Sequence, residues 1–270
     1  MHALSVFFGV LVGLSLGLTG GGGTLLAVPM LVYGLAVPAA DAVGISLASV
    51  GMTSLLGVIQ RLRRGHVEVA TGLMFAAAGM VGAPLGTQIS LLLPETALLV
   101  LFSGIMLGVA AFMWRRSEPD LPGPAAEPTD VLAGESKPVC DGNGQITTRC
   151  RVILLLTGVL TGVLSGTFGV GGGFVIVPAM VTFGGMSMHR AVGTSLLIIV
   201  LVSLSGVTSF LLRGRTLDWQ LTALFLIGGA LGLTLSTLLV TRISGPRLRR
   251  IFAIGIVFIA LFVVARTLMG

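Results

Sequence analysis

Long apolar stretches follow one another along the chain, separated by short stretches that carry most of the basic residues. Several reach the ~20 residues that a helix needs to cross a bilayer. Stretches such as 97–114 are apolar on every side and lack strict alternation, so each stretch predicts a helix. The expected segments are 3–18, 24–37, 41–60, 68–93, 96–114, 152–168, 173–187, 190–212, 218–240 and 251–268. The pattern therefore predicts an all-α polytopic membrane protein.

The second half of the chain repeats the first without gaps, at a distance of 149 residues. The aligned pairs include 20–29 with 169–178, 42–47 with 191–196, Ser54 with Ser203, and 64–65 with 213–214. Shared hydrophobicity alone does not align glycine, proline, serine and arginine at one offset. Each half is therefore expected to hold about five helical segments, of which the first two are short.

The short segments leave two arrangements open. Each pair is either one broken span, giving eight spans, or a helical hairpin, giving ten segments. The ten-segment arrangement with both termini outside places all of the 16 lysines and arginines except Arg213, Arg215 and Arg266 on the cytoplasmic side, as the positive-inside rule requires. An odd number of segments per half then makes the two repeats inverted. The count does not separate fully crossing pairs from re-entrant ones.

A polar stretch rich in proline and acidic residues divides the chain. The expected organisation is a first transmembrane repeat at 1–116, a polar cytoplasmic linker at 117–150 and a second, inverted transmembrane repeat at 151–270. The carboxylates outside this linker lie at expected helix ends. No acidic side chain is therefore expected in mid-span, where a proton relay would need one.

Composition agrees with a membrane protein, since 54% of the residues are hydrophobic and only 10% are charged, against about 25% in soluble domains. The net charge of +6 does not indicate a nucleic-acid partner, because the basic residues lie at expected helix ends without interleaved aromatic residues. It indicates loops beside anionic lipid. The 40 glycines are the more unusual feature.

Glycine-rich sequence joins the two short segments of each half, as LTGGGGT and as TFGVGGG; we call 20–23 the first glycine break and 169–173 the second. A helix interrupted in the membrane leaves backbone N–H groups that bind anions. Broken helices at corresponding places of inverted halves indicate a transporter substrate site. The candidate substrate-binding residues are Gly20, Gly21, Gly22, Gly23, Thr24, Ser46, Gly169, Gly171, Gly172, Gly173, Thr194 and Ser195.

Structural roles compete with binding at several positions. The candidate hydroxyls are those of Thr24, Ser46, Thr194 and Ser195. Instead of binding substrate, each could donate a hydrogen bond to a backbone carbonyl of its own helix. Ordinary interhelical hydrogen bonds are expected of Thr53, Ser54, Gln88 and Ser203, and helix kinks of Pro29 and Pro178. Close helix packing is expected of the glycines spaced by four, which are Gly9, Gly13, Gly17, Gly158, Gly162 and Gly166.

Enzymatic, cofactor and metal motifs are not recognisable. The first glycine break is not followed by the Gly-Lys-Ser/Thr of a phosphate loop. Cys140 and Cys150 have no further ligands nearby in sequence, which argues against zinc. The sequence therefore predicts a protein that is not an enzyme and that uses no cofactor and no metal.

At the blocks LTGGGGTLLAVPML…AVGISL and GTFGVGGGFVIVPAM…AVGTSL, the sequence resembles the TauE/SafE family of sulfite exporters, related to sulfonate uptake permeases. The resemblance covers both halves but not the linker. It implies a carrier in the prokaryotic plasma membrane for small sulfur-containing anions such as sulfite, thiosulfate, sulfoacetate or sulfonates. The resemblance suggests export as the direction of transport and the proton as the coupling ion.

The leading hypothesis is an exporter that works by alternating access, with a midplane site at the glycine breaks. A passive anion channel, an uptake permease for another small organic anion and a non-transporting membrane subunit are the alternatives. The expected partners are a small anion and the lipid bilayer, and not nucleic acid. Assembly into a homo-oligomer stays open.

Overall fold

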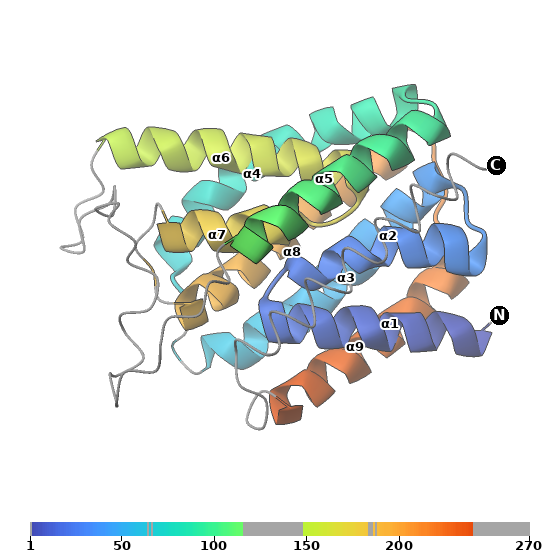
Figure 1. Ribbon diagram of the computed structural model, residues 1–270, viewed down its shortest axis with the longest axis horizontal. Helices are drawn as coiled ribbons and strands as arrows, with labels where there is room; N and C mark the ends of the chain where they lie inside the picture. The colour runs from blue at the N-terminus through green and yellow to red at the C-terminus, as the bar shows by residue number, and fades with distance from the viewer. Residues whose placement is uncertain are drawn as a thin grey trace.

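The computed structural model describes residues 2–63, 65, 67–115, 148–182, 186 and 188–239, and all regular structure in these residues is helical. In chain order (Figure 1) the elements are α1 (His2–Thr19), η1 (Gly22–Leu26), α2 (Ala27–Pro29), η2 (Met30–Gly34), α3 (Ala39–Leu62), α4 (Val69–Leu92), α5 (Glu95–Arg115), α6 (Thr148–Phe168), α7 (Gly173–Thr182), α8 (Met188–Leu212) and α9 (Trp219–Leu239). The expected segment 251–268 and residues 117–147 of the expected linker lie outside the described residues.

Four helical stretches in the described part are long and apolar enough to cross a membrane, which are Ala39–Leu62, Val69–Leu92, Arg190–Leu212 and Trp219–Ser236. Their surfaces expose large hydrophobic side chains, such as Val81 and Leu204. Exposed apolar area of this extent is unusual in a soluble protein and fits lipid. The prediction of an all-helical chain with several apolar spans is confirmed.

Glycine lets two pairs of helices pack closely, α1 with α9 and α4 with α6. A Cβ atom on Gly17 would lie 2.7 Å from the Cβ of Ser236, and one on Gly166 would lie 2.8 Å from the backbone nitrogen of Thr87. A side chain at either glycine would therefore push the helices apart. The other glycines spaced by four are equally confined, so the prediction that these glycines pack helices is confirmed.

The second short segment of the first half changes helix type along its length. It is a 3₁₀ helix over Gly22–Leu26, a single α turn over Ala27–Pro29 and a π helix over Met30–Gly34. Pro29 lacks a backbone N–H and crowds the preceding turn, which disfavours a regular α ladder at this place. The corresponding segment of the second half, α7, is a regular α helix.

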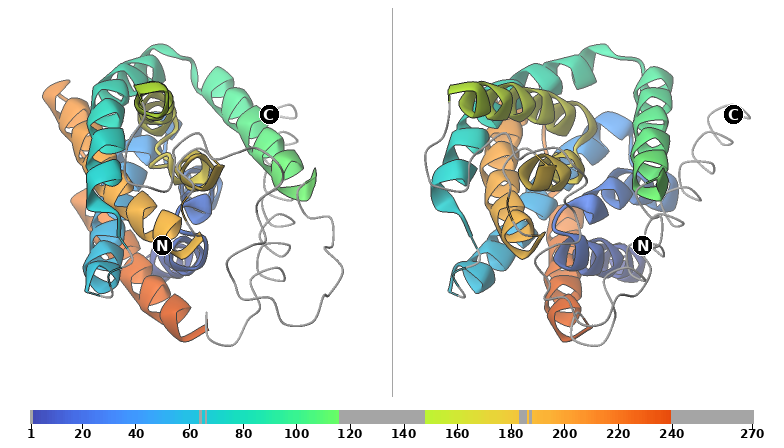
Figure 2. Two further views of the ribbon diagram at one scale, coloured as in Figure 1. Left: turned by 90° about the vertical axis from the view of Figure 1, so that its left-hand side faces the viewer. Right: turned by 60° about the vertical axis from the view of Figure 1, so that its left-hand side comes forward.

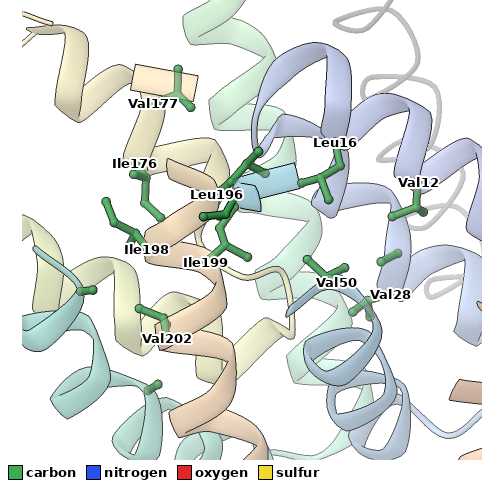
Figure 3. Packing of buried hydrophobic residues seen from close by; sticks show 14 of the residues in the cluster. Val12, Leu16, Val28, Val50, Ile176, Val177, Leu196, Ile198, Ile199 and Val202 are labelled. Atoms are coloured by element: carbon green, nitrogen blue, oxygen red, sulfur yellow. The ribbon is translucent and has the colours of Figure 1, made fainter. Parts of the chain in front are cut away.

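The second segment of each half is surrounded by other helices. Helix α7 packs against α6, α8 and η1, and Figure 2 shows it beside α6 and α8. Val50 of α3 approaches Ile199 and Leu196 of α8 in the same buried cluster (Figure 3). The core of the molecule thus lies where elements of the two halves meet.

Candidate functional site

The two glycine breaks contact each other through their backbones. A Cβ atom on Gly173 would lie 2.5 Å from the Cα of Gly21 and 2.7 Å from the Cδ1 of Ile199. A Cβ on Gly21 would in turn collide with the backbone of Gly173. Two stretches that are far apart in sequence therefore meet at a place where hydrogen is the only side chain that fits.

Left-handed glycine residues end α1 and α6 in the same way. The φ angles are +75° at Gly20 and +69° at Gly169, and +66° and +67° at Gly171 and Gly172. Other residue types rarely adopt this conformation, so these positions require glycine. The prediction that consecutive glycines interrupt the helices is confirmed at both breaks.

Two serine hydroxyls connect the halves reciprocally. The Oγ of Ser46 donates to the carbonyl oxygen of Gly169 at 2.5 Å, and the Oγ of Ser195 donates to the carbonyl oxygen of Gly20 at 2.7 Å. Ser46 and Ser195 are 149 residues apart, as are Gly20 and Gly169. Each half thus holds the break of the other half with an equivalent hydrogen bond, and all four residues are buried.

The two threonines of the candidate site have other partners. The hydroxyl of Thr24 donates to the carbonyl of Gly21 at 2.7 Å, within the first break itself. The hydroxyl oxygen of Thr194 accepts the backbone N–H of Glu68 at 2.9 Å, at the start of α4. The structure therefore brings Ser46, Ser195 and the glycines together, whereas the Thr194 hydroxyl bonds a helix end instead.

A cavity of about 380 Å³ opens between the start of α3 and the start of α9. It is lined by Ala36, Val37, Pro38, Asp41, Ile45, Thr216, Leu217, Asp218 and Leu221. The carboxylate of Asp41 pairs there with the guanidinium of Arg215 at 3.5 Å. We call this space the Asp41 cavity. Its inner wall includes Ile45, the residue before Ser46.

At the equivalent place in the other half, the corresponding residues that the structure describes contact each other. At the repeat distance of 149 residues, Thr194 corresponds to Ile45 and Glu68 corresponds to Leu217. Thr194 and Glu68 are joined by the hydrogen bond described above. A Cβ atom on Gly72, the counterpart of Leu221, would lie 3.0 Å from the Cγ2 of Thr194. We call this contact the Thr194 seal. The two halves therefore differ at corresponding positions.

Buried serine hydroxyls without a hydrogen-bond partner occur at several places in the described part of the chain, Ser90 of α4 among them. The hydroxyls of Ser54, Ser165 and Ser203 make no hydrogen bond within the described part of the chain. The expectation of ordinary interhelical hydrogen bonds is therefore wrong for Ser54 and Ser203. Ser203 lies instead beside Gly51 and Gly171, which have no side chain to bond. Thr53 bonds the carbonyl of Ser49 in its own helix, and Gln88 is exposed. The prediction did not include Ser165, which precedes the second break by one helical turn.

One cation reaches toward the first break. The Nη2 of Arg61 donates to the carbonyl oxygen of Gly17 at 2.8 Å, in the last turn of α1. A positive charge at a helix C-terminus is stabilised by the helix dipole. Among the described residues, no group of three or more His, Cys, Asp or Glu residues is placed to hold a metal ion.

Comparison with known proteins decides the family. The family model described as "Sulfite exporter TauE/SafE" matches residues 5–263. The chain belongs to this family.

Relatives of this TauE/SafE protein carry transporter names. It is 34% identical over 262 residues to a "Probable membrane transporter protein" of Xylella fastidiosa (strain 9a5c), covering 96% of this chain and 93% of the relative. It is 27% identical over 222 residues to the "Probable membrane transporter protein YdhB" of Bacillus subtilis (strain 168), covering 82% and 83% of the two chains. No solved structure matches the chain.

Membership of the family settles several predictions. This TauE/SafE protein is a multi-pass membrane protein of a transporter family with bacterial homologues, and it is not an enzyme. The sequence resemblance is therefore confirmed. The substrate, its site and the transport mechanism are finer questions, which the geometry of the glycine breaks addresses.

Proposed function

We propose that this protein exports small sulfur-containing anions, such as sulfite, thiosulfate, sulfoacetate or sulfonates, by alternating access. The binding site would lie at the two glycine breaks, near the midplane of a prokaryotic plasma membrane. The observation that carries the proposal is the meeting of the two breaks, held by the reciprocal bonds of Ser46 and Ser195. Irregular backbone at membrane depth is tolerated where it is enclosed by protein.

The packing supports two equivalent repeats, which the charge-based topology makes inverted. Helix α1 packs along α9 and α6 packs along α4, and these two pairs exchange when each helix is replaced by its counterpart in the other half. If inverted pairs crossed the membrane fully, their glycine breaks would lie on opposite sides of it. The contact of Gly21 with Gly173 therefore favours re-entrant pairs that enter from opposite sides.

The difference between the Asp41 cavity and the Thr194 seal supports alternating access. A carrier must expose its site to one side while it closes the other, and exchange of the two conformations between inverted repeats achieves this. With the charge-based topology, the Asp41 cavity faces outside and the seal faces the cytoplasm. The conformation described here would then be open to the outside.

Backbone amides suit the proposed substrates. Short helix N-termini offer N–H donors and a positive dipole end without a formal charge, which favours anions but leaves them free to dissociate. The proposed cytoplasmic end holds Arg61, Arg63 and Arg190, which would attract an anion to that side. At the outer cavity, Arg215 offsets the charge of Asp41.

Purified protein in liposomes tests the proposal. Wild-type protein should release internal sulfite and show counterflow, in which external unlabelled sulfite accelerates exchange of labelled sulfite. Gly171→Val should reduce this flux to background, because valine is strained at a φ of +66° and its Cβ would lie 3.0 Å from the Cγ2 of Ile199.

Gly104→Val is the matched control, since a Cβ at Gly104 meets no atom within 4 Å, and it should transport normally. Flux without counterflow would identify a passive channel. The absence of flux for every sulfur anion tested would contradict the proposed function.

A further inference from the structure

We propose that the hydroxyls of Ser165 and Ser203 are substrate ligands, which together with the first backbone N–H groups of α7 bind the oxygen atoms of a small oxyanion. This inference rests on the proposed function and assigns the donors at the second glycine break. It differs from the sequence-based site, whose serines are already engaged in hydrogen bonds between the halves.

Ser203 lies between a glycine of α3 and the second break. A Cβ atom on Gly171 would lie 3.7 Å from the Oγ of Ser203, and a Cβ on Gly51 would lie 3.5 Å from the same oxygen. Ser203 is only 1% exposed, and its hydroxyl has no partner among the described residues. A buried donor therefore points at backbone that glycine leaves bare.

Ser165 approaches the next residue of the break from α6. Its Cβ lies 3.6 Å from the position that a Cβ on Gly172 would occupy. The side chain is fully buried, and its hydroxyl is likewise unpaired within the described chain. The carbonyl of Ser165 accepts the N–H of Gly169 at 2.8 Å, which fixes the serine relative to the start of the break. Two serines from different helices, both with unpaired hydroxyls, thus adjoin consecutive glycines.

An unpaired buried hydroxyl is costly, because burial without a hydrogen bond costs about 1–3 kcal/mol. The surrounding core does not lack acceptors, since Ser46, Ser195, Thr24 and Thr161 all find carbonyl partners. A ligand that is absent from this conformation would explain the cost at Ser165 and Ser203. The explanation also fits Ser54, the counterpart of Ser203, whose buried hydroxyl is unpaired among the described residues.

The chemistry of this donor set selects a class of ligand. Two neutral hydroxyls and the amides at the N-terminus of α7, a helix of 10 residues, can donate to several oxygens of one anion. A sulfite, sulfonate or thiosulfate group presents two or more acceptor oxygens on one sulfur, whereas a halide presents a single centre. The site should therefore prefer oxyanions of this shape to chloride.

Alanine variants separate a ligand role from a structural one. Ser203→Ala and Ser165→Ala should each weaken sulfite binding to the full-length purified protein by about tenfold, equivalent to ~1.4 kcal/mol. Without anion, the thermal-unfolding midpoint should stay equal or rise, because each change removes an unsatisfied buried group. Chloride at the same ionic strength should not protect the wild-type protein against unfolding.

Ser103→Ala is the control, since Ser103 is equally buried but donates to the carbonyl of Leu99 in its own helix. It should leave sulfite binding unchanged. If both variants bind sulfite as tightly as the wild-type protein, this assignment is wrong. A lowered thermal-unfolding midpoint without anion would also contradict it. Either result would leave the proposed function standing. If the wild-type protein binds neither sulfite, thiosulfate nor sulfoacetate, both the assignment and the proposed function are wrong.

Discussion

The Asp41 cavity and the Thr194 seal occupy corresponding places in a duplicated sequence, yet one is a cavity and the other is a hydrogen-bonded contact. At the cavity, Ile45 and Leu217 are apolar and do not hydrogen-bond through their side chains. At the seal, Thr194 and Glu68 stand in their places, and the threonine hydroxyl accepts the N–H at the start of α4. Divergence at a few residues between the repeats has therefore given the two ends different closing contacts.

This difference bears on how the protein works. If the ends were chemically identical, neither would be preferred in the absence of substrate. A single hydrogen bond contributes about 0.5–1.5 kcal/mol, which is enough to favour one side several-fold. We infer that the polar pair biases the resting protein toward closure at the seal, and that the centre between the two ends is common to both conformations.

The largest effect on sulfite flux is expected at the contact between the two glycine breaks, which lies between the two ends. Gly173→Val and Gly21→Val each place a side chain into the backbone of the other break, so both should lower sulfite flux in liposomes to background. Gly108→Val is a suitable control, because a Cβ at Gly108 meets no atom within 4 Å. Transport by Gly173→Val at the control rate would contradict a central role for the contact.

A smaller effect is expected from removal of the serine hydroxyls that connect the two halves. The loss of stability should be equal in the two halves. Ser46→Ala leaves the carbonyl of Gly169 without its donor, and Ser195→Ala does the same to Gly20. Each should lower the free energy of unfolding in detergent by about 1–3 kcal/mol. Ser49→Ala, which loses only a bond to the carbonyl of Ile45 in its own helix, should cost less. Markedly unequal losses for Ser46 and Ser195 would show that the halves are not held equivalently.

Removal of the seal should make the two ends more alike. Thr194→Ile introduces the residue type found at position 45 and deletes the acceptor for the N–H of Glu68. A cysteine at position 67 should then react more rapidly with a maleimide added from the cytoplasmic side, by several-fold, because closure loses about 0.5–1.5 kcal/mol. Thr194→Ser keeps the acceptor and should react like the parent protein. Unchanged reactivity in Thr194→Ile would argue against the seal.

The smallest effect is expected at the rim of the cavity. Arg215 and Asp41 pair at 3.5 Å, with 45% and 37% of their side chains exposed. Solvent-exposed pairs contribute at most about 1 kcal/mol. Arg215→Gln should therefore change sulfite flux by no more than about fivefold, and added salt should reduce even this difference. A large loss of flux would indicate that the ion pair acts as a gate.

The fold was largely predictable because hydrophobic length and the repeat are strong signals. The expected segments 41–60 and 190–212 match α3 and α8 to within a few residues. Glycines spaced by four predicted close helix packing, since small residues at helical spacing have few other uses in a membrane. That the partner of α1 is α9 came only from the structure. The change of helix type after Gly22 was not predictable, because it depends on what the segment packs against rather than on its composition.

The candidate site was predictable in its backbone but not in its hydroxyls. Consecutive glycines predict a helix break locally, and the break is where the sequence places it. Which serines bond carbonyls and which stay unpaired depends on neighbours from the other half, which a local pattern does not contain. Ser46 and Ser203 illustrate this point, since the first bonds Gly169 while the second faces Gly51 and Gly171.

Distances across the two ends during transport provide the most direct test of alternating access. In a chain whose Cys140 and Cys150 are replaced by serine, one spin-label pair at positions 40 and 216 would span the Asp41 cavity. A second pair at positions 67 and 190 would span the seal. Electron paramagnetic resonance in liposomes, with and without sulfite, then reports both ends. We predict that sulfite shortens the first distance and lengthens the second. Changes of the same sign at both ends, or none while sulfite is transported, would contradict the account.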